Sequence, residues 1–342
     1  MPKRGARLKR NIAGAFFTMY TIRGAQMGII DVVELKKYFP VKRKAFAKPQ
    51  WLKAVDGVSF SVKQGAVFAL VGESGSGKTT VARLILKLVS PTAGKILFQG
   101  NDIQTLKKDA LREFRKSTQI IFQDPFASLN PRMTVFDTVS EPLKIHKLAK
   151  KNELHDKVVH LLQSVGLQAD VLSRYPHEFS GGQRQRICIA RALAVSPKVL
   201  VADEPLSALD VSIQAQILNI LQELRKQSHI SFLFISHDLR VVQYFSDEVA
   251  VMYLGKIVEH ANTDELFSSP FHPYTIELLS SAPRIKPGGK KKEILKGDVP
   301  SPINIPTGCP FHPRCPKRFA PCDTVVPELK ETENRLVSCH LF

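Results

Sequence analysis

Several features are scarce in this sequence, and each scarcity excludes a class of protein. The 342 residues contain no run of 18 or more apolar residues, so we do not expect the chain to span a membrane by itself. Five cysteines are too few for the disulfide scaffold of a small secreted protein. With 44% hydrophobic and 23% charged residues, the chain is neither collagenous nor disordered as a whole. The length predicts about two domains, or one domain with extensions.

Acidic residues are also scarce, and most of all near the start. The chain carries 49 Lys+Arg against 31 Asp+Glu, a net charge of +18. Residues 1–53 alone hold a balance of +11, and a second basic run extends from Arg284 to Lys296. A basic protein binds nucleic acid, anionic lipid or phosphorylated ligands. Because the excess lies in a leader and a linker, a membrane-surface or solubility role competes with a nucleic-acid groove.

Apolar runs that resemble strands alternate with helical patterns along the chain. This alternation predicts an α/β fold with a largely parallel sheet. About 75 mostly helical residues separate the second run from the third, too many for one crossover, and they predict an inserted helical subdomain over about residues 124–192. The five predicted strands are Val67–Val71, Gln119–Phe122, Val199–Ala202, Ser231–Ile235 and Glu248–Tyr253.

A glycine-rich segment after the first of these strands fits the pattern G-x-x-x-x-G-K-[ST] and opens a helical pattern. Glycines in such a loop allow backbone N–H groups to surround phosphate oxygens, and the helix N-terminus adds positive potential. In this P-loop, Lys78 reaches the β- and γ-phosphates and the Thr79 hydroxyl ligates Mg²⁺. The predicted ATP-binding residues are Gly72, Glu73, Ser74, Gly75, Ser76, Gly77, Lys78, Thr79 and Thr80.

Two carboxylates, Asp203 and Glu204, follow the third predicted strand. Asp203 would hold the magnesium ion, directly or through water. Glu204 would accept a proton from the attacking water as the general base. Alone, such an acid pair is usually a solvated strand end, but its occurrence together with a P-loop favours the catalytic interpretation.

A second glycine-rich motif, Phe179-Ser180-Gly181-Gly182-Gln183, precedes an amphipathic helix. A helix that begins with serine and glycines offers N–H donors to an anion. One P-loop already binds one nucleotide, so we expect this motif to contact the γ-phosphate of ATP held by another subunit. The alternative, a glycine-rich N-cap without a ligand, would be favoured if the motif stood alone.

Together these motifs resemble the nucleotide-binding subunit of an ATP-binding-cassette (ABC) transporter, over about residues 29–280. The P-loop matches Walker A, the strand ending in Glu204 matches Walker B, and the second motif matches the signature, with Phe179 where many members have leucine. Gln123 matches the Q-loop, Ser207-Ala208-Leu209-Asp210 the D-loop, and His237 the switch histidine.

This resemblance implies a P-loop NTPase core with an antiparallel β subdomain and an inserted helical subdomain. It also implies roles for further residues. Gln123 would join Thr79 and Asp203 around Mg²⁺, His237 would contact the γ-phosphate, and Asp210 would face the partner's ATP. An aromatic residue at the A-loop would stack on adenine; Phe39 is the first choice and Tyr38 the second.

Three further segments resemble the oligopeptide/dipeptide permease ATPases: residues 123–132, 207–216 and 271–275. The basic insert Lys42–Lys53 and the order Val-Ser-Ile-Gln after the D-loop resemble the second of that system's two ATPase subunits. The resemblance implies a heterodimer with a related ATPase, two transmembrane permease subunits and an extracytoplasmic substrate-binding protein. It places the chain on the cytoplasmic face of the inner membrane, with no specific nucleic acid. Relatives carry peptides, nickel, glutathione or sugars.

The other cysteines lie in the tail, spaced C-x5-C-x6-C-x16-C: Cys309, Cys315, Cys322 and Cys339. A reducing cytosol disfavours disulfides, and four thiolates suit zinc or an iron–sulfur cluster. The spacing lacks the close C-x2-C pairs of zinc ribbons, and the tail segment 308–315 also resembles the permease subfamily, whose members carry a [4Fe-4S] cluster there. Zn²⁺ remains the alternative, with His312 and His340 as spare ligands. Cys188 is interpreted as a small buried apolar residue.

These observations predict three regions: a basic leader (1–27), a nucleotide-binding domain (28–280), and a linker with a cysteine-rich extension (281–342). The leader resembles a signal peptide, but the ATP chemistry that follows favours a disordered or membrane-touching segment, with Met27 as an alternative start. The extension is expected to be separate from the ATP site. Two alternatives to an importer ATPase are a nucleic-acid-associated ABC ATPase and a module that binds ATP without hydrolysing it. The presence of Glu204 and His237 makes the second alternative less favourable.

Overall fold

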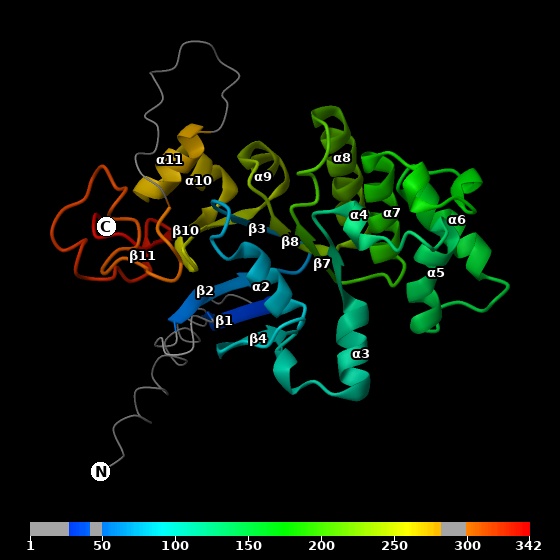
Figure 1. Cartoon of the computed structure of the whole chain (residues 1–342), viewed down its shortest axis with the longest axis horizontal. Coiled ribbons are helices and arrows are strands. Elements are labelled where there is room, and N and C mark those ends of the chain that lie inside the picture. Colours follow the sequence, from blue (N-terminus) through cyan, green and yellow to red (C-terminus); the bar gives the residue numbers. More distant parts are fainter. Residues whose placement is uncertain (1–26, 42–49, 282–298) are drawn as a thin grey trace.

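The computed structural model describes residues 27–41, 50–281 and 299–342. Residues 1–26 of the predicted leader, residues 42–49 of the basic insert and the basic run of the linker lie outside this part. Two sheets and the helices around them make up the described chain (Figure 1). Among its helices, none combines the length and the apolar character that a membrane span requires.

The larger sheet has the strand order β11-β12-β10-β9-β3-β8-β7-β6. Its five parallel strands are the five that the sequence predicts, and their residues are almost all buried. Parallel strands covered on both faces read as continuous apolar runs, which is why they were visible in the sequence. The strands are β3 (Val67–Val71), β6 (Thr118–Ile121), β7 (Val199–Asp203), β8 (Ser231–Ile235), β9 (Glu248–Tyr253) and the antiparallel β10 (Lys256–Asn262), β11 (Lys330–Thr332) and β12 (Arg335–Val337).

The smaller sheet is antiparallel, in the order β2-β1-β4-β5. Its apolar face shares one buried core with helix α2 and with the larger sheet, where Phe60 stacks on Phe68 at 4.6 Å between ring centroids. This core fixes the helix that follows the P-loop between the two sheets. The elements are β1 (Ile30–Val41), β2 (Gln50–Val62), β4 (Ala93–Phe98), β5 (Asn101–Asp102) and α2 (Lys78–Ile85).

The chain between β6 and β7 is helical and forms the green lobe at one end of Figure 1. Helix α7, which follows the signature motif, packs against the other helices of this lobe and against α8. The lobe contains α4 (Pro125–Ser128), α5 (Val135–Ile145), α6 (Leu154–Ser164) and α7 (Gly181–Leu193), with 3₁₀ turns at 169–171 and 176–178. The remaining helices are α3 (Lys108–Ser117), α8 (Val211–Ser228), α9 (Leu239–Phe245), α10 (Thr263–Ser268) and α11 (Pro273–Ser281).

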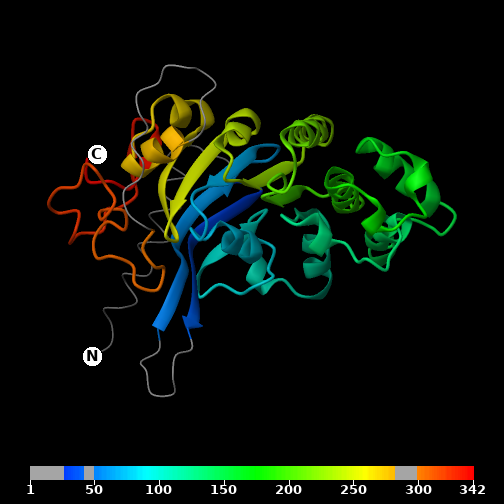
Figure 2. The same cartoon turned by 45° about the horizontal axis from the view of Figure 1, so that its top comes forward.

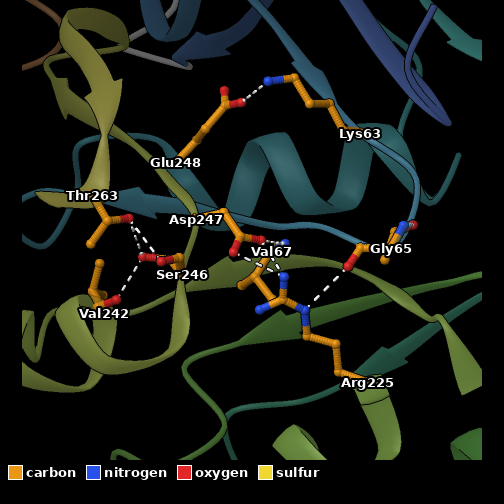
Figure 3. Close-up of polar contacts among 10 residues, drawn as sticks. Lys63, Gly65, Val67, Arg225, Val242, Ser246, Asp247, Glu248 and Thr263 are labelled. Carbon is orange, nitrogen blue, oxygen red and sulfur yellow. Dashed lines mark hydrogen bonds and ion pairs between the residues drawn. The ribbon is translucent and has the colours of Figure 1, made fainter. Parts of the chain in front are cut away.

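The strand that leads into the P-loop is anchored at its first residue by a polar network (Figure 3). The Val67 N–H donates to Asp247 Oδ2 at 2.7 Å, and Arg225 donates to both oxygens of the same carboxylate at 2.9 and 2.6 Å. Beside this network, Lys63 pairs with Glu248 at the start of β9. The network ties β3 to the end of α8 and to the start of β9, so it fixes where the P-loop begins.

The cysteine-rich extension is joined to the larger sheet by strand pairing. Strand β12 pairs with β10, and Cys309 to Cys339 lie in loops beside that edge, at the C-terminal end in Figures 1 and 2. Strands β11 and β12 have three residues each, too short to give a readable alternation in the sequence. The sequence therefore gave no sign of this strand pairing.

Candidate functional site

The P-loop joins β3 to α2 and is shaped by glycines that no larger residue could replace. Gly77 has φ of 108°, and a Cβ there would lie 2.1 Å from the carbonyl oxygen of Ala54. The ammonium group of Lys78 is buried and donates to the carbonyls of Gly72 and Glu73, at 2.8 and 2.9 Å. Burial lowers the pKa of Lys78, while nearby carboxylates oppose that shift. The P-loop therefore holds the Lys78 ammonium group among its own backbone carbonyls.

Three predicted site residues converge from the ends of three neighbouring strands. Glu204, after β7, accepts a hydrogen bond from Gln123 Nε2, after β6, at 3.0 Å. The same Oε2 atom lies 3.1 Å from Nδ1 of His237, after β8. Glu204 has φ of 48°, held by its N–H bond to Ile235, so the chain turns sharply where the carboxylate must be presented. The parallel strands thus bring together residues more than 80 positions apart.

A pair of oxygen ligands for magnesium lies beside this group. The Thr79 hydroxyl donates to Asp203 Oδ1 at 3.1 Å, and the Asp203 side chain is buried. Burial raises the pKa of Asp203, the Thr79 hydrogen bond lowers it and Glu204 raises it. A buried carboxylate beside a hydroxyl and a second carboxylate suits a hard divalent cation that prefers oxygen ligands. These residues therefore fit Mg²⁺.

Most of the predicted ATP residues surround one cavity of about 720 Å³, whereas Gly72, Glu73 and Ser76 of the P-loop do not line it. That volume lies in the usual range for small-molecule sites. Leu52, Ala54 and Pro302 also line it. None of the three was predicted, because apolar residues that line a cavity belong to no motif. The predicted residues that line the cavity are Ser74, Gly75, Gly77, Lys78, Thr79, Thr80, Gln123, Glu204 and His237.

The two A-loop candidates, Phe39 and Tyr38, do not line this cavity but differ in their relation to it. Phe39 lies opposite Leu52 in the β1–β2 register, so its side chain is on the face that Leu52 presents to the cavity. Tyr38 instead donates its hydroxyl to Asp56. Burial raises the pKa of Tyr38, and Asp56 adds to the shift. This register favours Phe39 over Tyr38, and the adenine contact stays a prediction.

The signature motif lies outside this chain's own ATP cavity. Ser180 caps α7, accepting from the Gln183 N–H at 3.4 Å, and its side chain is exposed. Gly182 is packed so closely on α8 that a Cβ would lie 2.5 Å from Ile213. Asp210, at the start of α8, is exposed as well. The signature and the D-loop therefore form one surface, with polar groups directed outward.

All four tail cysteines line one small cavity together with three histidines: Cys309, Cys315, Cys322, Cys339, His272, His312 and His340. All four are free thiols, although no three of the described His, Cys, Asp or Glu side chains are placed as a ready metal site. Burial raises the pKa of Cys309 to about 11, and the other three cysteines add to that effect. Four converging thiols are the donor set that iron–sulfur clusters and zinc use. Cys188 is buried, as predicted.

A contact that sequence reasoning missed joins this tail to the P-loop. Arg314, in the loop between Cys309 and Cys315, donates to both carboxylate oxygens of Glu73, at 2.8 and 3.0 Å. The Glu73 N–H in turn donates to the hydroxyl of Tyr274 at 2.9 Å. Arg314 and Tyr274 belong to segments quoted above for their resemblance, but no local sequence pattern predicts which residue a buried arginine or tyrosine contacts.

Comparisons with known proteins agree with this geometry. The family described as "ABC transporter" matches residues 55–207, and the one described as "Oligopeptide/dipeptide transporter, C-terminal region" matches residues 258–322. The oligopeptide transport ATP-binding protein AppF of Bacillus subtilis (strain 168) is 50% identical over 93% of this chain and 98% of its own length. The dipeptide transport ATP-binding protein DppF of Escherichia coli (strain K12) is 46% identical over 92% of this chain and 94% of its own.

Solved structures show the same fold. The dimeric ATP-binding cassette MJ0796, bound to ADP and phosphate, has a TM-score of 0.61 and 25% identity over 68% of this chain and 98% of its own. CbiO1 from Clostridium perfringens, part of a transporter complex, has a TM-score of 0.61 and 28% identity over 71% of this chain and 92% of its own. These similarities give no support to a nucleic-acid-associated ATPase. The chain belongs to the ABC transporter family, as an ATP-hydrolysing subunit of the oligopeptide/dipeptide type.

Proposed function

We propose that this chain powers the uptake of oligopeptides or dipeptides across the cytoplasmic membrane. It would work at the cytoplasmic face with two transmembrane permease subunits, an extracytoplasmic substrate-binding protein and a second, related ATPase. The names of AppF and DppF, which state oligopeptide and dipeptide transport, support the cargo class.

One observation supports pairing with a second ATPase. The signature residues Ser180 to Gln183 lie outside the cavity that Lys78 and Glu204 line, and the polar side chains of the motif are exposed. A phosphate-binding helix start directed away from its own nucleotide needs a nucleotide from another chain. We infer a head-to-tail dimer, in which each ATP lies between one P-loop and the partner's signature and D-loop.

The hydrolytic step assigns a separate role to each converging residue. Glu204 accepts a proton from the attacking water, and its bonds from Gln123 and His237 orient the carboxylate. Lys78 stabilises charge on the phosphate oxygens. His237 contacts the γ-phosphate. Closing and reopening of the dimer would then drive the pore between two states.

Two bound groups complete the proposed site. Thr79, Asp203 and Gln123 would hold Mg²⁺, which neutralises phosphate charge, and Phe39 would stack on adenine. Within the chain, residues 28–280 would act as the nucleotide-binding domain, with the helical subdomain at about 124–192, and residues 281–342 as linker and extension.

The four tail cysteines would hold a [4Fe-4S] cluster, with Zn²⁺ as the alternative. Their convergence on one cavity supports a metal group, since protonated thiols gain little from such proximity. Anaerobically purified protein should then be brown and hold about four irons per chain, whereas zinc would give colourless protein with about one metal. Metal analysis of the wild type and of Cys322→Ser decides between them.

The function as a whole is tested by isolating the chain with its partners. Protein extracted from membranes in mild detergent should co-purify with two permease subunits and a different ATPase, and the complex in vesicles should take up peptides only with ATP. Vesicles that hold this chain as the sole ATPase and still transport at the full rate would contradict the heterodimer. ATP-driven uptake of nickel or sugar but not peptide would contradict the cargo.

A further inference from the structure

We propose that Arg314 is a positioning residue for the ATP site, through which the four-cysteine extension controls nucleotide affinity. The inference needs only ATP binding at the P-loop. It does not depend on the cargo or on which group the cysteines hold.

The ion pair between Arg314 and Glu73, called the clamp below, has a well-defined geometry. The guanidinium donates two parallel hydrogen bonds to the carboxylate, at 2.8 and 3.0 Å, a geometry that fixes orientation as well as distance. The Arg314 side chain is only 4% exposed and that of Glu73 23%, so water screens the pair weakly. Glu73 stands inside the P-loop, between Gly72 and Ser74.

The clamp is rigid because its base is packed. Phe311, three residues before Arg314, is buried against Tyr253 and Tyr274, with ring centroids 5.4 Å from each. The Tyr274 hydroxyl accepts the Glu73 N–H, so backbone and side chain of the same P-loop residue are both held. Since Cys309 and Cys315 bracket this loop, the fold of the cysteine site sets where the guanidinium stands.

The clamp also removes a charge that would oppose the ligand. An unpaired Glu73 carboxylate would place a negative charge in the loop that receives the phosphates, and a partly buried charge is felt strongly. Arg314 cancels it. Pro302, from the same extension, lines the ATP cavity, so the extension meets the nucleotide site at two places. Loss of the arginine should therefore weaken nucleotide binding through repulsion.

The test is a double-mutant cycle on the full-length, metal-loaded protein, with ATP affinity measured by a fluorescent nucleotide in Mg²⁺. Arg314→Ala should raise the Kd about 10-fold, within the usual range for coupling between two sites. Glu73→Gln should change it less than about 3-fold, because the amide carries no charge. The double variant should bind like Glu73→Gln, since the repulsion is absent. High salt should shrink the Arg314→Ala defect.

Two control variants distinguish a folding defect from the loss of the Arg314–Glu73 ion pair. Lys330→Ala removes an exposed positive charge from the same extension, on edge strand β11, which three strands separate from β3, and should leave the Kd unchanged. Arg314→Lys keeps the charge but loses the fork, so it should give an intermediate defect and serves if the alanine variant does not fold. Wild-type affinity in Arg314→Ala would overturn the inference. So would a double variant as weak as Arg314→Ala, because a collapsed extension is not rescued by a neutral residue 73.

The coupling must also act in the reverse direction. ATP with Mg²⁺ should slow labelling of the buried Cys309 and Cys322 by a thiol reagent in metal-free protein, at least 3-fold. The effect should vanish in Glu73→Gln. Equal labelling rates with and without nucleotide in the wild type would contradict the coupling, even in a protein that hydrolyses ATP normally.

Discussion

The nucleotide site and the cysteine-rich extension are built in opposite ways. The nucleotide site stands at the ends of buried parallel strands, and its polar residues belong to short motifs that indicate their chemistry. The extension has two three-residue strands, and its cavity is lined by cysteines up to 30 positions apart. The sheet holds the first site in place. The second depends on its loops, and Arg314 and Pro302 connect it to the first.

The largest effects should come from the motif residues of the nucleotide site. Glu204→Gln should lower turnover more than about 100-fold with ATP affinity retained, because the amide cannot accept a proton while the phosphate contacts remain. ATP should then trap the dimer. Lys78→Ala should instead lose ATP affinity itself. Steady-state ATPase rates and nucleotide titration of both variants separate the roles. Normal turnover in Glu204→Gln would show that Glu204 is not the general base.

The stability of the extension should depend on how its side chains pack. Phe311→Ala should destabilise it by about 3 kcal/mol, since it removes a fully buried ring from between Tyr253 and Tyr274. Thermal unfolding followed by thiol exposure should show the extension opening before the sheet melts. Phe319→Ala, an aromatic of the same extension that is 45% exposed, is the matched control and should cost less than about 0.5 kcal/mol. Similar losses in both variants would contradict a specific role of Phe311.

A smaller effect is expected at the ion pairs that hold the sheet beside β3. Burial raises the pKa of Glu248, but the hydrogen bonds from His260 and Lys63 outweigh it and bring the pKa to about 2. A pKa below the unfolded value of 4.5 gives stability that is complete above pH 4.5 and is lost as the pH falls toward 2.

The stability gap between the wild type and Glu248→Gln should therefore shrink by about 1 kcal/mol between pH 6 and pH 3.5. Denaturant unfolding at each pH measures it. Lys226→Ala, at the solvated end of α8, should show a constant gap. A gap that grows on acidification would mean that Glu248 is not held ionised by its partners.

The smallest effect belongs to the adenine contact. Phe39→Ala should weaken ATP binding about 3-fold, because stacking on one exposed ring contributes little beside the phosphate contacts. Tyr38→Phe, which removes only the hydroxyl that donates to Asp56, should leave the affinity unchanged. A larger loss in Tyr38→Ala, which removes the ring, than in Phe39→Ala would assign the adenine contact to Tyr38.

Prediction from the sequence succeeded where structure is local. The five parallel strands, the helix after the P-loop and the burial of Cys188 were visible because periodicity and motif spacing determine them. It failed where two distant segments meet. Leu52 and Pro302, which line the ATP cavity, and Arg314, which pairs with Glu73, lie in segments whose composition says nothing of their partners.

By itself, the sequence predicted the chemistry of this protein: a loop to bind phosphates, carboxylates to hold magnesium and activate water, and the four thiols of the tail. Backbone geometry and side-chain type suffice for these, because each motif carries its reactive groups within a few residues. Only the tertiary structure decided that the tail contacts the P-loop and lines part of the ATP cavity. The pairing of β12 with β10 and the bonds from Arg314 to Glu73, 241 positions away, depend on how the sheet edge and the loops pack, which no local pattern encodes.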